Sequence, residues 1–352
     1  MIAIYADPAL LALPNGLADS SDELATLIDR VIELSIWARD CGAFTIVKPD
    51  NLEDLLVGAG AFPTFSIVKE TLDAGDLSDT FDTRDVLLSL LAIMERAHGA
   101  AEAFGVDVSR SDVSGPTLTP LFDRFPVAVR SMSINALASI CLLKSTGRLK
   151  ADAFAVSGHP KLGRQTLPFE AVVEELSTSE DLTFDLPVRI SGSVEVLSSP
   201  KDVLHTGRAV SLWCAAQDAA EIHAAVEARV HELVAPDEAA GARSRFSIGS
   251  EFVRSLKENQ AFSDGKFAST VLETCARIAA GTPKYDINDF GVRSNDGALG
   301  KRTHATKHRP ALRLLFWMHC DGEVEFANIG QKNDLDIEAG DPELRVSTIY
   351  PV

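Results

Sequence analysis

The first sixty residues alternate between strand-like and helix-like segments, and this order limits the folds open to the chain. Residues 2–6 and 44–47 are short apolar runs typical of buried strands. Between them, apolar residues recur at the spacing of one helix face: Leu24, Leu27, Ile28, Val31 and Ile32. Ser20 and Glu23 have the spacing of a capping box, and a further helix begins after residue 50. We therefore predict an α/β N-terminal domain with a short parallel sheet covered by helices.

The remaining pattern predicts a second domain of a different class. A chain of 352 residues suits two domains, and Ser199-Pro200 is a plausible boundary, which gives domains over 1–200 and 201–352. Helix-like stretches lie at about 208–234, 249–258 and 264–280, and strand-like runs at 312–319 and 323–329. Asp321-Gly322 between the two runs is a hairpin signal. We expect an α+β C-terminal domain that ends in this β-hairpin.

Composition indicates a soluble cytoplasmic protein. Hydrophobic residues make up 46% of the chain and charged residues 24%, which are ordinary globular values. The start of the chain lacks the basic and apolar regions of a signal peptide, and no apolar run reaches the roughly eighteen residues that span a bilayer. Five cysteines without a Cys-x-x-Cys pair argue against a disulfide framework or a zinc ribbon. We expect no membrane partner.

One segment reverses the charge of the chain. The net charge is −18, yet residues 297–313 hold five basic residues and no acidic one: Lys301, Arg302, Lys307, Arg309 and Arg313. His304 and His308 lie among them, and Gly297 and Gly300 leave the backbone free to approach a phosphate. Residues 284–313 have seven basic and three acidic residues, so the rest of the chain has a net charge of −22. Such a basic island would draw an anionic ligand to one place. The alternative is a solvated loop whose cations pair with the protein's own acidic surface.

The histidines of this region admit other roles. His304 and His308 are four residues apart, which on a helix would present both to one metal ion. Gly300 and Pro310 disfavour a helix there, so we expect no metal site. His319 could act as a general acid or base, or as a half-buried structural residue.

Acidic residues offer a different site, in the N-terminal domain. Asp7 closes the first strand, Glu53 opens the helix after the second strand, and Asp152 precedes a later strand. Carboxylates gathered at one sheet edge bind Mg²⁺ and can organise phosphodiester hydrolysis. The order Ile4-Tyr5-Ala6-Asp7, then Ile46-Val47-Lys48-Pro49 to Glu53, resembles the PIN-domain nucleases. The alternative is that these acids are helix caps and turn formers. Residues 157–164, with two glycines, Lys161 and Arg164, could cradle a phosphate or form an ordinary turn.

The C-terminal end resembles a second family. Arg313-Leu-Leu-Phe-Trp317, Asp321-Gly-Glu-Val-Glu325 and Asn328-Ile-Gly-Gln are similar to the closing hairpin of RelE/ParE-like toxins. That resemblance implies that Arg309, Arg313 and His319 face RNA or a protein partner. The whole chain also resembles accessory proteins of bacterial anti-phage defence systems, with an Asp-Pro after its first strand and a hairpin near its end.

We therefore expect a nucleic-acid-associated component of an antiviral defence system. It would contact phosphates through the basic island of residues 297–313 and act with other protein subunits. It needs no cofactor in this interpretation. One alternative is a PIN-like nuclease that uses Mg²⁺ with Asp7, Glu53 and Asp152. Another is a non-catalytic subunit whose acidic face binds a basic partner. The sequence leaves open whether the chain is an enzyme and whether it binds RNA or DNA.

Overall fold

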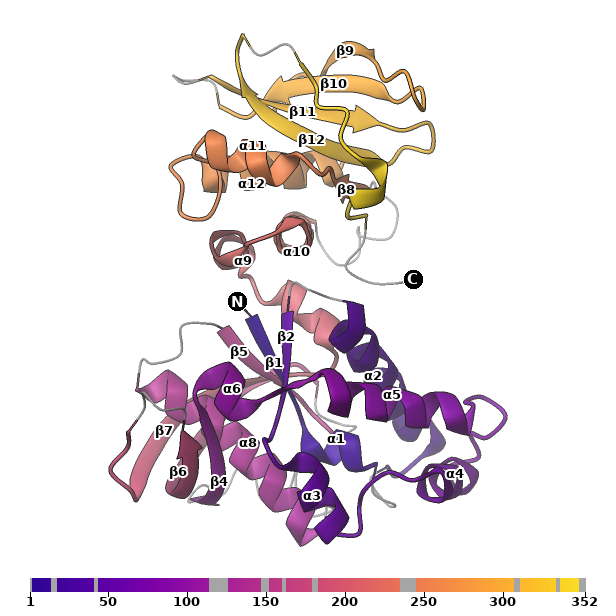
Figure 1. Cartoon of the computed structure of the whole chain (residues 1–352), viewed down its shortest axis with the longest axis vertical. Helices are drawn as coiled ribbons and strands as arrows, with labels where there is room; N and C mark the ends of the chain where they lie inside the picture. Colours follow the sequence, from indigo (N-terminus) through magenta and orange to yellow (C-terminus); the bar gives the residue numbers. More distant parts are fainter. Residues whose placement is uncertain are drawn as a thin grey trace. The chain divides into compact units, whose positions relative to one another are not determined.

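The computed structural model divides the chain into two compact units, Met1–Val203 and Leu204–Val352 (Figure 1). The boundary predicted from the sequence lay between residues 200 and 201. The residues described by the structure are 2–13, 18–40, 44–113, 126–146, 152–159, 163–178, 183–234, 245–306, 311–333 and 336–347.

The first unit is built on a mixed sheet in the order β3-β2-β1-β5-β7-β6-β4. Its strands are β1 (Ile2–Ala6), β2 (Phe44–Lys48), β3 (His98–Gly99), β4 (Val106–Val113), β5 (Asp152–Val156), β6 (Gln165–Thr178) and β7 (Val188–Leu197). The pairs β3-β2, β2-β1, β1-β5 and β5-β7 are parallel, whereas β6 is antiparallel to both of its neighbours. Every residue of β1 is buried, as expected for a central parallel strand covered on both faces. The predicted α/β class is confirmed, but the sheet is mixed and larger than the short parallel sheet that we expected.

Capping residues begin several helices of this unit. The helices are α1 (Pro8–Ala12), α2 (Ser21–Asp40), α3 (Leu52–Gly58), α4 (Phe65–Ala74), α5 (Thr83–Arg96), α6 (Ala100–Phe104) and α8 (Val127–Ser145). At the start of α2, the Ser20 hydroxyl accepts from the Glu23 N–H at 3.2 Å, and the Glu23 carboxylate accepts from the Asp19 N–H. Asp82 caps α5 in the same way. Helices α2 and α5 pack on each other and on β2, while α8 packs on β4, β6 and β7.

The sequence pattern did not predict the long hairpin of β6 and β7 correctly. The alternation of apolar residues over 183–197 predicts one or two strands that break at Gly192, but β7 passes through Gly192 without a break. A side chain there would crowd the Cys141 sulfur of α8, which explains the glycine within a continuous strand. The strand pattern over residues 165–178 was not recognised at all.

The second unit has a sheet in the order β8-β12-β11-β10-β9. Its strands are β8 (Phe246–Ile248), β9 (Asn288–Val292), β10 (Leu299–His304), β11 (Leu312–Met318) and β12 (Val324–Gln331). The helices are α9 (Ala209–Ala215), α10 (Ala219–Leu233), α11 (Phe252–Glu258) and α12 (Ala268–Ala279), with the 3₁₀ helices η1 (Pro200–His205) at the unit boundary and η3 (Pro342–Leu344) near the end. The predicted helix over 208–234 is therefore two helices. Within the predicted loop over 297–313, residues 299–304 and 312–313 are strand, and residues 307–310 lie outside the described residues.

Helices α11 and α12 lie against one face of this sheet (Figure 1). The Phe252 ring of α11 contacts Phe326 of β12, with ring centroids 5.9 Å apart. Strands β11 and β12 are antiparallel, but the unit does not end there. The chain continues through residues 336–347, in which Val346 bridges back to Ile248. We call residues 336–347 the C-terminal segment.

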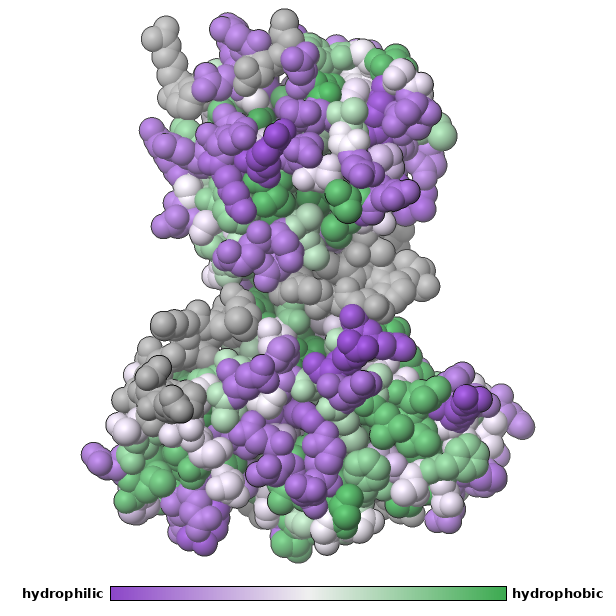
Figure 2. Space-filling model, in the orientation of Figure 1, coloured by the Kyte–Doolittle hydropathy of each residue, from purple (hydrophilic) through white to green (hydrophobic). Residues whose placement is uncertain are grey.

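One helix in the described part of the chain, α8, is long and apolar enough to cross a membrane. About 61% of its most apolar window is buried inside the protein, as in the core helix of a soluble protein. Hydrophilic and hydrophobic patches are mixed over the visible face of each unit (Figure 2). These observations are consistent with the predicted solubility.

Candidate anion-binding site

A polar cavity of about 170 Å³ opens on the sheet of the second unit. It is lined by Asn288, Arg302, Thr303, His304, Arg313 and Lys332, and we call these residues the basic pocket. Three of them, Arg302, His304 and Arg313, belong to the basic island identified in the sequence. None of the lining residues is acidic, so the pocket has the chemistry of an anion site.

Strand pairing brings four of these side chains onto one face: Asn288, Arg302, His304 and Arg313. Arg302 and His304 are two residues apart on β10 and therefore project to the same side of the sheet. His304 is directly opposite Arg313 of β11, and Arg302 is directly opposite Asn288 of β9. Lys332 follows the last residue of β12 and completes the rim.

The cations of the pocket repel one another. Burial lowers the pKa of Arg313, and the charge of Arg302 lowers it further. Arg313 Nη1 lies 2.8 Å from His304 Nδ1, so the guanidinium donates to the imidazole when Nδ1 carries no proton. The Arg302 guanidinium lies over the Phe290 ring, 4.5 Å from its centroid. Among the described ion pairs, Arg302, Arg313 and Lys332 have no carboxylate partner.

Lys301 lies on the other face of β10 and does not join the pocket. It forms an ion pair with Asp289, its partner in the strand register. We expected Gly300 to let a phosphate approach the backbone. Instead, Ile337 of the C-terminal segment packs against Gly300, and a side chain at this position would collide with Ile337. Lys307, His308 and Arg309 lie outside the described residues. Asn288 and Lys332 were missed, because only the register places Asn288 beside Arg302 and Lys332 beyond Arg313.

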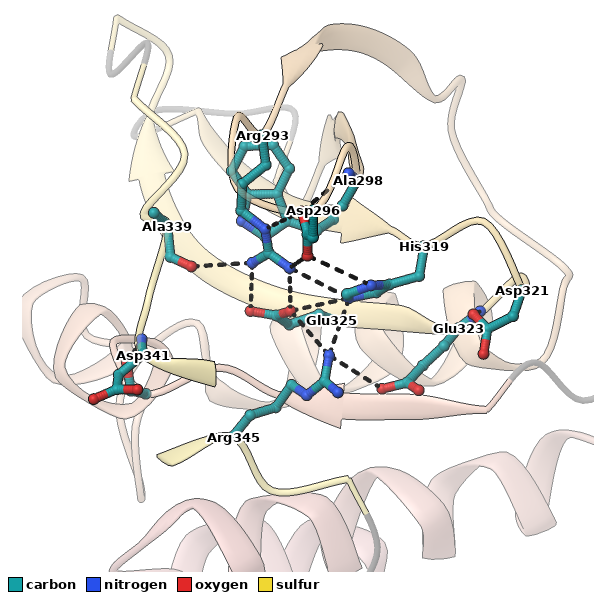
Figure 3. A network of polar contacts seen from close by, with 12 residues as sticks. Arg293, Asp296, Ala298, His319, Asp321, Glu323, Glu325, Ala339, Asp341 and Arg345 are labelled. Carbon is teal, nitrogen blue, oxygen red and sulfur yellow. Dashed lines mark hydrogen bonds and ion pairs between the residues drawn. The ribbon is translucent and has the colours of Figure 1, made fainter. Parts of the chain in front are cut away.

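His319 belongs to a second cluster of charges on the same face (Figure 3). Arg293 forms two parallel bonds to Glu325, each 3.0 Å long, and bonds to Asp296 as well. His319 Nε2 lies 3.0 Å from Glu325, and Arg345 reaches both His319 and Glu325. We call Arg293, Asp296, His319, Glu325 and Arg345 the ion-pair network.

The ion-pair network is closed on itself. The side chains of Arg293 and Glu325 are each only 4% exposed. Burial alone lowers the pKa of Arg293, but its bonds to Asp296 and Glu325 raise it above the ordinary value. The bond from Arg293 likewise lowers the pKa of Asp296 to about 2. Arg293 also bonds to the Ala339 carbonyl, and Trp317 to the Glu338 carbonyl, so the network fastens the C-terminal segment to the sheet.

The three acids of the predicted nuclease site do not converge. Asp7 follows the carboxyl end of β1, but Asp152 pairs with Ile2 and therefore lies at the opposite end of the sheet. Its side chain is outside the described structure. Glu53 pairs with Lys48. Within the described residues, no group of three or more histidine, cysteine or acidic side chains could hold a metal ion.

Asp7 instead holds the chain in place. Its carboxylate caps α1 through the Ala9 N–H and accepts from the Ser133 hydroxyl and the Gly158 N–H. Burial raises the pKa of Asp7, although these bonds lower it. The cavity beside it, about 10 Å³, has room for no more than one water molecule.

The turn after β5 is also occupied by protein contacts. Arg30 donates to the Ser157 and His159 carbonyls, at 3.0 Å each, and the Gly158 N–H is used by Asp7. These groups are therefore not available to a phosphate. Residues 160–162, which include Lys161, lie outside the described residues.

A buried acid that sequence reasoning missed lies at the start of β4. Asp107 accepts from the Asp50 N–H at 3.1 Å, and burial raises its pKa to about 6. The neighbouring Tyr5 hydroxyl is buried and has no partner with hydrogen-bond geometry. Asp50 caps α6 by accepting from the Ala101 N–H. Only the packing of β4 against the rest of the unit distinguishes Asp107 from a surface aspartate.

Comparison with known proteins places the chain in no family: no family model, no curated protein and no solved structure matches it. The resemblances to PIN-domain nucleases, RelE/ParE-like toxins and anti-phage accessory proteins therefore remain predictions, and the basic pocket is the candidate functional site.

Proposed function

We propose that the second unit binds nucleic acid by seating backbone phosphates in the basic pocket. One observation carries the proposal: Arg302, Arg313 and Lys332 line one cavity, and none of the carboxylates that the structure describes forms an ion pair with them. A phosphate would accept hydrogen bonds from the arginine forks and relieve the repulsion that lowers the pKa of Arg313.

The charge of the whole chain supports contact at this place alone. The total of −18 disfavours binding to a polyanion elsewhere, since like charges repel. Salt would weaken the contact at the pocket, because each phosphate bound releases counterions from the nucleic acid. A role in antiviral defence and the presence of other protein subunits remain predictions from the sequence, since the chemistry of the pocket bears on the anion only.

Equilibrium binding of fluorescently labelled oligonucleotides to the full chain tests this proposal. The double variant Arg302→Gln, Arg313→Gln should bind at least about tenfold more weakly than the unaltered chain, with a smaller slope of log affinity against log salt. Lys301→Gln is the matched control, because it removes one cation from the same strand but from the opposite face. Equal affinity of the double variant and the unaltered chain would overturn the proposal.

A further inference from the structure

We infer that the ligand is single-stranded nucleic acid, with a phosphate in the basic pocket and bases stacked on Phe290 and Tyr285; this inference rests on the proposed function. The bases are the new element, because the pocket by itself explains only the backbone. Single-stranded RNA and DNA share the chemistry that the surface requires.

The face of the sheet that carries the pocket is the one turned away from α11 and α12. Thr303 pairs with Leu314, and Leu314 pairs with Ile329, on the side where Phe326 contacts α11. Arg302 and His304 alternate with Thr303 and so point to the other side. At one end, that side is covered by the C-terminal segment, whose Ile337 packs with Trp317. The basic pocket opens at the other end.

Two aromatic rings stand beside the cations of this face. Phe290 is two residues from Asn288 on β9, and its half-buried ring lies beneath the Arg302 guanidinium. Tyr285 precedes β9, is also half-buried, and meets the His304 ring edge-on at 5.9 Å between centroids. The Lys284 ammonium lies 5.6 Å from the Tyr285 centroid. Cations and aromatic rings thus alternate along this side of β9 and β10.

This combination fits a single strand better than a duplex. Successive bases of a single strand can stack on aromatic side chains while a basic groove holds the backbone. In a duplex the bases are paired and stacked inside, so rings on a sheet face cannot reach them without unstacking. The cations also lie inside a concave cavity, which a flexible strand can enter by bending. Stacking is sequence-tolerant because every base has a flat face, so we expect weak sequence preference.

The experiment compares four labelled ligands of equal length and equal phosphate count per strand on the full chain: single-stranded RNA, single-stranded DNA, the matching duplex, and a DNA strand without bases. We expect at least one of the base-containing single strands to bind about tenfold or more tightly than the duplex and the abasic strand. If the abasic strand or the duplex binds as tightly as the single strands, the inference is wrong while the phosphate contact stands. If nothing binds, including the abasic strand, the proposed function fails as well.

Variants locate the stacking. Phe290→Leu and Tyr285→Leu keep apolar bulk but remove the rings, and each should weaken single-strand binding about tenfold without changing abasic binding. Phe262→Leu is the matched control, because Phe262 also lies under a lysine, Lys257, at 4.7 Å, but in the loop between α11 and α12. Photo-crosslinking with an iodouracil-containing strand, mapped by mass spectrometry, should place the adduct at Phe290 or Tyr285. Adducts confined to other peptides, or unchanged single-strand affinity in both variants, would overturn the inference.

Discussion

Two clusters of arginine share one face of the β9–β12 sheet, and they differ in what surrounds them. In the ion-pair network, Arg293 and Arg345 meet Glu325, and Arg293 also meets Asp296. In the basic pocket, Arg302 and Arg313 line a cavity that has no carboxylate among its described lining residues. The first cluster is neutralised and holds the C-terminal segment, whereas the described part of the second cluster has an excess of positive charge. Arginine content alone therefore does not distinguish the two clusters; the carboxylates beside the arginines do.

The largest difference between the two clusters is expected when one arginine is removed from each. Arg293→Met should reduce the free energy of unfolding by about 3–5 kcal/mol, because Glu325 stays buried without its main partner. Arg302→Gln should change it by less than about 0.5 kcal/mol, since it breaks no ion pair. Urea unfolding of the full chain, followed by tryptophan fluorescence, measures both. Similar losses in the two variants would show that the pocket arginines are structural.

A buried acid without a cation extends the comparison to the first unit. Burial raises the pKa of Asp107 to about 6, from 3.8, so the folded state binds its proton more tightly than the unfolded state. Stability should therefore fall as the pH rises through the window from about 4 to about 6, by up to about 3 kcal/mol from this group. Asp107→Asn should remove that dependence and stabilise the first unit at pH 7.

Asp296 should give the free energy of unfolding a pH dependence of the opposite sign. Its pKa lies at about 2 because Arg293 favours the charged form, so its contribution to stability is lost as the pH falls from about 4 towards 2. Unfolding free energies of Asp107→Asn and Asp296→Asn, measured between pH 3 and 8, should deviate from the unaltered chain in opposite directions at pH 7. Deviations of equal sign would contradict the assignment of one acid as unpaired and the other as paired.

A carboxylate introduced into the basic pocket should neutralise its arginines, as Glu325 does in the ion-pair network. Asn288 is the register partner of Arg302, so Asn288→Asp places a carboxylate beside it. The new pair should stabilise the chain by no more than about 1 kcal/mol, because the pocket is open to solvent. Oligonucleotide affinity should drop about tenfold, as the added charge competes with phosphate for the same guanidinium. Tighter binding by Asn288→Asp would refute an anion site.

The smallest effect is expected for Lys301, which lies on the face of β10 opposite to Arg302 and His304. Lys301→Gln removes the pair with the exposed Asp289, and it should change both the free energy of unfolding and oligonucleotide affinity only slightly, by less than about 0.5 kcal/mol each. The same unfolding and binding measurements check it. A large loss of affinity in this variant would move the site from the pocket to the face of β10 that carries Lys301.

Local patterns were sufficient for much of the first unit. The apolar runs of β1 and β2 and the cap of α2 depend on neighbours in sequence, and they were predicted from spacing alone. Strand β6 was missed because Pro168 lies within it and its outward positions are polar. In the part of the chain that the structure describes, β4 pairs with β6 only from Ala171 onward, so β7 is the one described strand beside Pro168, as at a sheet edge where proline is tolerated.

The candidate site, too, was predictable from the sequence only in part. The charge of residues 297–313 is a property of the sequence, and so is the prediction that an anion would be drawn there. Strand alternation then sent Lys301 and Arg302 to opposite faces, which a segment interpreted as a loop could not reveal. The acids of the nuclease alternative are separated for a related reason: Asp152 begins its strand whereas Asp7 follows the end of its own, so parallel pairing places them at opposite ends of neighbouring strands.

By itself, the sequence determined the class of the fold, the N-terminal order of strands and helices, and the position of the basic island. Only the tertiary structure decided which cations are neutralised. Glu325 reaches Arg293 across 32 residues, and Lys332 reaches the pocket of Arg302 from the end of another strand. Charge composition is additive along a chain, but the pairing of charges depends on distances of a few ångströms that only strand register and packing set.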